Sequence, residues 1–360
     1  MLSLAKAWAW RANEHAFATT RKHGTLALAA GATALALAAW ALAAAGALRA
    51  GVVIAPPKGD PRKPAIQPAT DGQKDSEGFA LPANFRKSDG SFDQDAILAA
   101  QKKRAEIIQA KLSIRLAVVE TPHYLVFSGA DAALTASFVE WCEALYANLA
   151  RQFALERKDR VWDGKCMLLV FGGRPEFVSY AKIFDGCDAS NSAAYFAWER
   201  YGTPKLVHIC IPTDERRPAR LQELLAHEGT HAFFQLYRHP VVLPVWLQEG
   251  LAEYMTVVND PSLRLRKARP AEAIARSRGS ISRVLAADTP ALDGPEYSVA
   301  YTIVDALIRT DPAHFRKFVN FLKDGKKQDE AMKEAYGFDM AGLEERWRAV
   351  VLQSHPAAGR

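Results

Sequence analysis

A short apolar segment, Leu224–Tyr237, contains the pattern His227-Glu-Gly-Thr-His231, in which two histidines stand four residues apart. On an α-helix, residues four apart lie on the same face, so both imidazoles can point at one metal ion. Glu228 directly follows the first histidine, where it can take a proton from a water held by that ion. With nine histidines in 360 residues, such a match arises by chance on the order of once per hundred chains. The motif therefore indicates a metal site, which further ligands would support.

A second segment, Pro244–Tyr254, carries Glu249 and Glu253 one helical turn apart among mostly apolar residues. A carboxylate on a buried helix face needs a partner, because burying it alone is costly. We expect Glu249 to be the third protein ligand of a zinc ion, with the fourth position left for water. We expect Glu253 to accept the free imidazole N–H of a ligating histidine, which fixes its tautomer. The alternative is that both glutamates lie on a solvated helix face.

Together the two segments resemble the gluzincin zinc metallopeptidases, meaning the thermolysin-like and aminopeptidase-N-like enzymes and the broader peptidase MA-like group. In aminopeptidase-N-like members the third ligand is the glutamate of an Asn-Glu-Gly-Phe-Ala segment, and Glu249 in Gln248–Ala252 matches it. Thermolysin-like members carry an acid one turn later, which Glu253 matches. The spacing between His231 and Glu249 is one residue shorter than in the aminopeptidase pattern, and the intervening Arg238–Pro240 can absorb this difference.

The resemblance also implies a side chain that stabilises the oxyanion of the reaction. The segment Glu296–Val304 resembles the helix that carries a catalytic tyrosine in aminopeptidase-N-like enzymes, with a small residue three positions later. This alignment gives the role to Tyr297, with Ala300 as the small residue. A phenolic O–H beside the metal can hydrogen-bond the developing negative charge. Tyr301 is the alternative, and either tyrosine could instead be an ordinary core residue.

These residues predict a membrane-anchored zinc-dependent peptidase. In this interpretation His227, His231 and Glu249 hold Zn²⁺, and Glu228 is the general base for a zinc-activated water that hydrolyses a peptide bond. One alternative is a zincin-fold binding or assembly protein with a structural metal and no turnover, against which an intact Glu228 argues. Another is a hydrolase of non-peptide amides. The sequence has no Gly-Ala-Met-Glu-Asn-type amine-binding segment ahead of the helix, so endopeptidase action is the default expectation.

The pattern of apolar residues predicts an α+β domain over residues 113–360, and the resemblance implies that this domain is zincin-like. We expect a small mixed sheet with helices, followed by an all-helical half after Pro218. One expected strand, Ala193–Trp198, is either a peptide-binding sheet edge or an ordinary strand. The other expected elements are the strands of a hairpin, Ile114–Val119 and His123–Ser128, the strands Lys165–Phe171 and Lys205–Ile211, and the helices Ala130–Phe153 and Pro175–Phe184.

The N-terminal part of the sequence predicts a membrane anchor. Residues 1–24 form a basic tail, and residues 25–48 are uncharged, rich in Ala and Leu, and long enough to span a bilayer as a transmembrane helix or signal anchor. A small-residue cleavage site within Ala45–Ala50 is the alternative to a retained anchor. We expect a Pro/Gly-rich linker over 49–92 and an amphipathic helix over 93–112 that packs on the domain or forms a stalk. The expected location is single-pass in the bacterial inner membrane, with the catalytic domain in the periplasm.

Composition adds few constraints. The net charge of +6 is modest, and because no nucleic-acid-binding module is recognisable, we expect no nucleic-acid partner. The later basic cluster, Arg264–Arg278, is expected to be solvated surface, and the sequence does not indicate an oligomeric state. The four cysteines lack CxxC spacing and predict either two disulfides or four buried thiols. The histidines outside the motif are expected to be structural or surface residues: His15, His23, His123, His208, His239, His314 and His355.

Overall fold

The computed structural model describes residues 52–54, 85–156, 159–198, 204–214, 217–238 and 241–354. The chain divides into two units, Met1–Ala43 and Ala44–Arg360, and all described residues lie in the second. The predicted tail (1–24) and transmembrane helix (25–48) fall outside the described residues. Within the described part, no helix combines the length and apolar character needed to cross a membrane.

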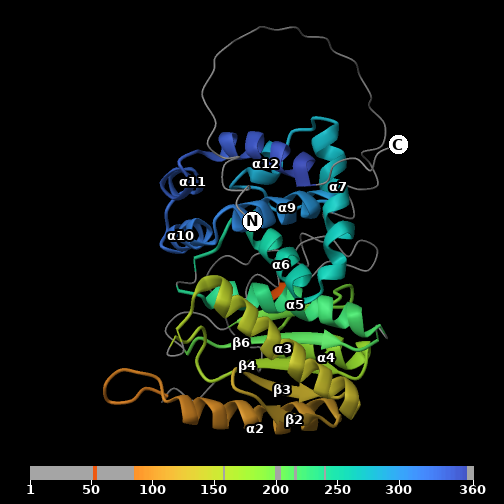
Figure 1. Cartoon of the computed structure of the whole chain (residues 1–360). Helices are drawn as coiled ribbons and strands as arrows, with labels where there is room; N and C mark the ends of the chain where they lie inside the picture. Colours follow the sequence, from red (N-terminus) through yellow and green to blue (C-terminus); the bar gives the residue numbers. More distant parts are fainter. Residues whose placement is uncertain are drawn as a thin grey trace, which may run out of the picture. The chain divides into compact units, whose positions relative to one another are not determined.

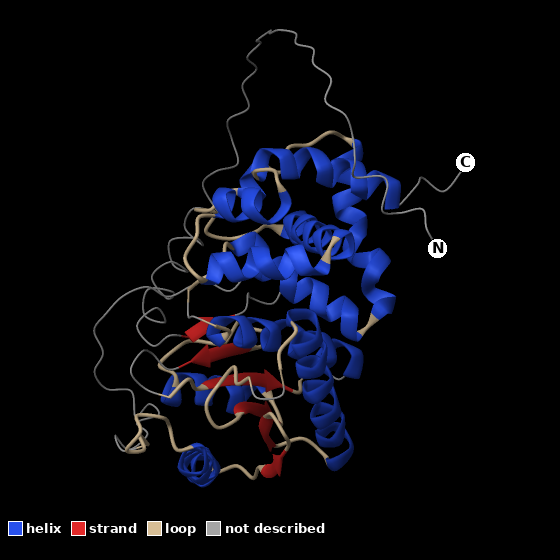
Figure 2. Cartoon of the chain, turned by 60° about the vertical axis from the view of Figure 1, so that its left-hand side comes forward, coloured by secondary structure: helices blue, strands red, loops and turns tan. Residues whose placement is uncertain are grey.

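A six-stranded mixed sheet forms one half of the described chain (Figures 1 and 2). Its central strands β3, β4 and β6 are parallel, whereas β2, β5 and β1 pair antiparallel with β3, β6 and β5 in turn. The predicted hairpin is confirmed, with Thr121–His123 as its turn. The strands are β1 (Val52–Ile54), β2 (Ala117–Glu120), β3 (Tyr124–Ser128), β4 (Cys166–Phe171), β5 (Tyr195–Trp198) and β6 (Val207–Pro212), in the order β1-β5-β6-β4-β3-β2.

Helices cover both faces of the sheet. Helices α3 (Ala132–Phe153) and α5 (Pro218–Leu236) share a core with one set of strand residues, including Val126, Leu168 and Ile209. Helices α2 (Gln94–Leu112) and α4 (Arg174–Phe184) pack on the alternate strand residues, such as Leu125 and Leu169. Strands β4 and β6 are therefore buried on both faces, which explains their continuous apolar sequence.

The predicted all-helical second half is confirmed from Pro218 onward in the described residues. Helix α9 is its centre, with every residue from Tyr297 to Ile308 buried, and α6 and α7 pack against it. Figure 2 shows this helical half and the strand-bearing half as separate regions. Its elements are α6 (Val245–Asn259), η1 (Pro261–Leu263), α7 (Arg264–Arg276), α8 (Ser282–Leu285), α9 (Gly294–Thr310), α10 (Pro312–Lys323), α11 (Gln328–Tyr336) and α12 (Met340–Ser354).

Three open points of the N-terminal half are decided by this packing. The amphipathic helix α2 packs on the domain, because Ile97 and Ile108 are fully buried. The linker predicted over 49–92 contains a strand, β1, whose β-branched residues suit an extended backbone. All four cysteines are free and buried, so the thiol alternative holds: Cys142, Cys166, Cys187 and Cys210.

Candidate metal centre

Helix α5 carries the first two predicted ligands into the interface between the sheet and the helical half. The helix begins at Pro218, whose fixed φ suits the first turn and whose missing N–H costs nothing there. His231 is buried, and its ring stacks on that of Phe196 in β5, with the ring centroids 5.9 Å apart. His227, one turn earlier, is partly exposed. The two imidazoles thus lie beside one end of the sheet with their Nε2 atoms 3.2 Å apart.

Helix α6 brings Glu249 to the same point. Its Oε2 atom lies 3.4 Å from Nε2 of His227 and 3.6 Å from Nε2 of His231. Three ligand atoms held at 2.0–2.2 Å around a tetrahedral zinc ion are separated by about 3.3–3.6 Å. The observed triangle of 3.2, 3.4 and 3.6 Å therefore has the dimensions of a zinc site. Oε2 of Glu249 is buried and accepts no hydrogen bond from any described residue, so a cation would satisfy it.

The electrostatics of the group favour a cation. Burial alone would raise the pKa of Glu249, but the two histidines lower it to about 2. Burial likewise opposes ionisation of Glu253, yet Lys267 and His227 hold its pKa at about 2. Burial would lower the pKa of His227, but the neighbouring carboxylates of Glu249 and Glu253, 3.4 and 3.3 Å away, raise it to about 10. Two ionised, buried carboxylates thus face the histidines, and a divalent cation can replace the protons that the imidazoles would otherwise carry.

The second nitrogen of His227 also has a partner. Its Nδ1 lies 3.3 Å from Oε1 of Glu253, which stands one turn after Glu249 on α6. When Nδ1 donates to this carboxylate, Nε2 is left as the lone-pair atom that faces Glu249 and His231. The structure therefore places Glu253 where the sequence interpretation requires it.

Glu228 lies between the two histidines and is almost fully buried. Its Oε2 atom has no hydrogen-bond partner among the described residues. Burial raises the pKa of this carboxyl group, against the opposing influence of His227 and His231. A carboxylate with a raised pKa is a stronger proton acceptor near neutral pH. This environment suits a general base, and the assignment of that role stays a prediction.

A close helix crossing brings α9 against the ligand-bearing helix. A Cβ atom added at Gly250 would lie 2.5 Å from the backbone oxygen of Ala300 and 2.7 Å from Val304. Only glycine allows this approach. Gly250, which follows Glu249, and Ala300, three residues after Tyr297, therefore both lie in the helix contact. Tyr297 is buried in the main core, whereas Tyr301 packs in a separate cluster with Val257 and Ala268. Both tyrosines are therefore buried, and the catalytic role of Tyr297, with Tyr301 as the alternative, stays a prediction.

A second group of potential ligands was not singled out from the sequence. Asp185, His208 and Cys210 are buried, with ligand-type atoms within 4.8 Å of one another. Here Oδ2 of Asp185 already accepts two hydrogen bonds, from Nε2 of His208 at 2.9 Å and from the hydroxyl of Tyr195 at 2.7 Å. The expectation that His208 is structural fits this network. A sequence signal existed in the alternation of His208 and Cys210, which places both on one face of β6.

The sequence analysis predicted that the basic cluster of α7 is solvated surface. The structure differs from this prediction at Lys267. The Lys267 ammonium is buried and contacts Glu223 on α5 at 2.7 Å and Glu253 on α6. Its neighbour Arg266 is exposed and reaches Glu223 from the outside at 3.3 Å. The prediction failed at Lys267 because α7 turns this one position inward, and helix orientation is set by packing against α9.

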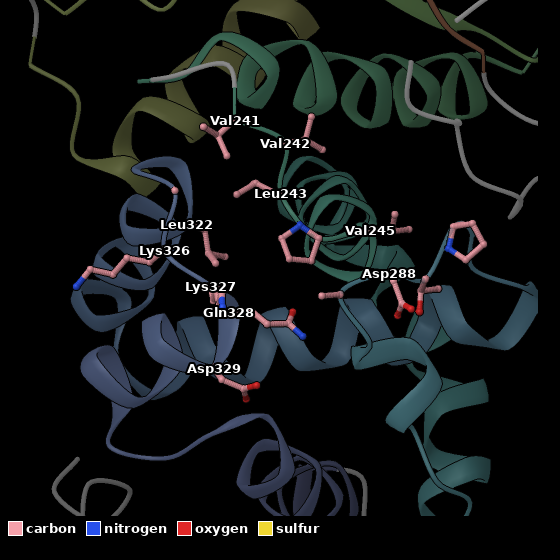
Figure 3. A pocket seen from close by; sticks show the side chains of 15 residues that line it. Val241, Val242, Leu243, Val245, Asp288, Leu322, Lys326, Lys327, Gln328 and Asp329 are labelled. Carbon is pink, nitrogen blue, oxygen red and sulfur yellow. The ribbon is translucent and has the colours of Figure 1, made fainter. Parts of the chain in front are cut away.

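A cavity of about 710 Å³ lies in the helical half, away from these residues (Figure 3). Figure 3 shows Val241 and Val242 on one side and Gln328 and Asp329 on the other. None of the predicted site residues lines it. The metal group, not this cavity, therefore remains the candidate site.

One comparison with known proteins covers the part of the chain that holds the metal group. Residues 200–353 match the sequence model of the Peptidase MA superfamily. No curated protein sequence matches the chain. An M1 zinc metallopeptidase from Deinococcus radiodurans and a mutant of it each match with 18% identity and a TM-score of 0.35, over 66% of this chain and 51% of theirs. The chain thus spans about half the length of those enzymes, and so weak a structural likeness adds nothing to the assignment. The part of the chain that carries His227, His231 and Glu249 is thus the part that matches the Peptidase MA superfamily.

Proposed function

We propose that this protein is a membrane-anchored peptidase that uses zinc to hydrolyse peptide bonds in peptide or protein substrates. The observation that carries the proposal is the triangle of His227, His231 and Glu249. Next to His227 in the sequence is Glu228, whose buried Oε2 atom has no hydrogen-bond partner among the described residues. A protein that holds zinc only for structure has no need of a buried carboxylate with a raised pKa next to an open coordination position. The proposal therefore favours turnover over a purely structural metal.

The chemistry divides between the ion and the side chains. Zinc held by His227, His231 and Glu249 would supply a Lewis acid for the substrate carbonyl and for water. Glu228 would accept a proton from the attacking water and return it to the leaving amine. Tyr297 donates a hydrogen bond from its phenolic O–H to the substrate oxygen that gains negative charge. Glu253 keeps His227 in one tautomer throughout.

The outer edge of β5 supports an extended peptide as the substrate. Phe196 of β5 stacks on the ligand His231, and Val53 of β1 is its antiparallel partner on the opposite side from β6. The backbone of a β5 without β1 would present unpaired N–H and C=O groups beside the metal ligands. An extended segment of the chain itself thus occupies an edge that an extended substrate can also use.

Because both would pair with the same edge, β1 is expected to compete with substrate. Val53→Pro removes a backbone donor and disfavours strand pairing. If β1 occupies the edge about 90% of the time, the variant should lower KM roughly tenfold and leave kcat unchanged. Peptide hydrolysis by the full chain measures both constants, with Ala65→Pro, outside the strand, as the control. An unchanged KM in Val53→Pro, or an equal fall in Ala65→Pro, would contradict the competition.

The anchor and the location belong to the same proposal. An uncharged segment of Ala and Leu at 25–48 supports a single-pass anchor in the bacterial inner membrane, with the peptidase domain in the periplasm. Four free cysteines are compatible with this placement only if they stay buried from oxidants, as they are here. Protease added to spheroplasts should degrade the domain, whereas a cytoplasmic domain would be protected.

Metal removal tests the activity itself. The purified full chain should bind one zinc ion at the His227 group and cleave members of an unbiased peptide library. Treatment with a chelator should abolish cleavage, because the three side chains alone cannot activate water, and added zinc should restore it. A chain that loses thermal stability on chelation but cleaves no peptide in the zinc-loaded form would favour the structural-metal alternative. If the zinc-loaded chain cleaves only non-peptide amides, its substrates are those amides, and the proposed peptide substrates would be wrong.

A further inference from the structure

A buried lysine joins three helices around the metal group. The Lys267 ammonium of α7 contacts Oε2 of Glu253 on α6 and Oε1 of Glu223 on α5. The three side chains are only 9–13% exposed. Glu223 lies one turn before His227 on α5, and Glu253 lies one turn after Glu249 on α6. Lys267 therefore contacts each ligand-bearing helix at the turn next to its ligand.

The two oxygens of Glu253 have different partners. Oε1 lies 3.3 Å from Nδ1 of His227, and Oε2 contacts Lys267. A carboxylate held at both oxygens cannot rotate away from the imidazole without losing a charge-assisted contact. Solvent weakens the electrostatic attraction in these contacts only a little, because water and salt screen buried charges far less than exposed ones. The orientation of the His227 ring thus depends on a chain of contacts that ends at Lys267.

Charge balance gives the lysine a second reason to be there. Glu249 is buried, and Glu253, one turn later on the same helix, has a side chain that is 13% exposed. Removing one partner from a buried pair leaves an uncompensated charge, which is strongly unfavourable. The ammonium of Lys267 contacts Glu253 on the side away from His227 and therefore places a positive charge beside this carboxylate.

We propose that Lys267 is a positioning residue, which locks the Glu253 carboxylate against Nδ1 of His227 and thereby aims Nε2 of that histidine at the metal. The inference rests on the proposed zinc site and not on the peptide substrate. Lys267 touches neither the substrate nor the ligand atoms that face the ion. Its effect should appear first in metal affinity and in the ligand geometry, and only through these in turnover.

The experiment compares Lys267→Met, Lys267→Arg and the control Arg266→Met in the full chain. Loss of an outer partner of a metal-ligating histidine typically weakens metal binding by about 10–100-fold. We expect that loss of zinc affinity in Lys267→Met, together with a changed visible spectrum of the cobalt-substituted protein. We expect kcat to fall with KM nearly constant, and Lys267→Arg to recover most of the affinity. Arg266 is 64% exposed and contacts only Glu223, so Arg266→Met should resemble the wild type.

A double-mutant cycle with Glu253→Ala separates positioning from general destabilisation. If Lys267 acts through Glu253, the variant lacking both should bind zinc no more weakly than Glu253→Ala alone. Additive losses, or a Lys267→Met variant with wild-type zinc affinity and cobalt spectrum, would overturn the proposal. If Lys267→Met does not fold, Lys267→Gln, which is also uncharged but can donate a hydrogen bond, replaces it in the same cycle. Zinc affinity and the cobalt spectrum need no substrate, so a chain that cleaves no peptide would refute the proposed function and leave this test intact.

Discussion

Glu228→Gln is expected to abolish peptide hydrolysis while zinc remains bound. The amide has nearly the same shape as the carboxylate but cannot accept a proton, and general-base catalysis typically contributes about 10²–10⁴-fold. We therefore expect kcat to fall by at least about 10³-fold, with KM little changed because the substitution acts on the transition state. The measurements are kcat and KM on any peptide that the wild type cleaves, together with the zinc content of both proteins.

The same substitution should not weaken the fold. Oε2 of Glu228 is buried and has no hydrogen-bond partner among the described residues, so the neutral amide relieves a burial penalty. Thermal unfolding should occur at an equal or higher temperature in Glu228→Gln than in the wild type. Glu140→Gln replaces an exposed carboxylate on α3 and should change neither activity nor stability. A Glu228→Gln protein as active as the wild type would contradict the assigned base.

Gly250→Ala is expected to damage both stability and activity, although alanine is the better helix former. The added methyl group would lie 2.5 Å from the backbone oxygen of Ala300, and a backbone atom cannot move aside without shifting α9. Overpacking of this kind typically costs about 1–3 kcal/mol. The shift also moves Tyr297 relative to Glu249, and a displacement of about 1 Å can reduce activity about 10²-fold.

Gly342→Ala is the matched control for this prediction. Gly342 lies in the first turn of α12, where a methyl group would lie 3.0 Å from the end of the flexible Arg346 side chain and 3.2 Å from Cβ of Phe338. None of its three nearest atoms belongs to the backbone, so Gly342→Ala should lower the stability much less than Gly250→Ala does. Thermal unfolding and kcat/KM of both variants make the comparison. Equal behaviour of the two variants would show that the crossing of α6 and α9 tolerates a side chain at Gly250.

Local patterns in the sequence predicted the secondary structure well because the core residues repeat with the period of each element. Helix α5 and its histidines follow from the spacing of apolar residues and of His227 and His231. The strands β4 and β6 follow from short continuous apolar runs, which are typical of buried parallel strands. By contrast, β1 has only three residues, too few for any periodicity, and its pairing with β5 depends on contacts far along the chain.

The inward position of Lys267 could not be predicted from the sequence. A lysine among several arginines on a helix resembles a solvated surface, because most such residues are exposed. Whether one position of that helix faces inward depends on how α7 lies against α9 and α6, which no local pattern encodes. The same holds for Asp185 and His208, which lie more than twenty residues apart in the sequence and meet across α4 and β6.

The sequence by itself determined the chemistry of the site: two histidines and a glutamate at helical spacing, followed by two more glutamates at helical spacing. Helical periodicity is local, so residue types and spacing were enough to put each pair on one face. Only the tertiary structure decided that the two helices meet with ligand atoms 3.2–3.6 Å apart. It also decided that Gly250 admits α9 and that Lys267 holds Glu253. These arrangements depend on helix crossings, which are set by the summed packing of distant side chains.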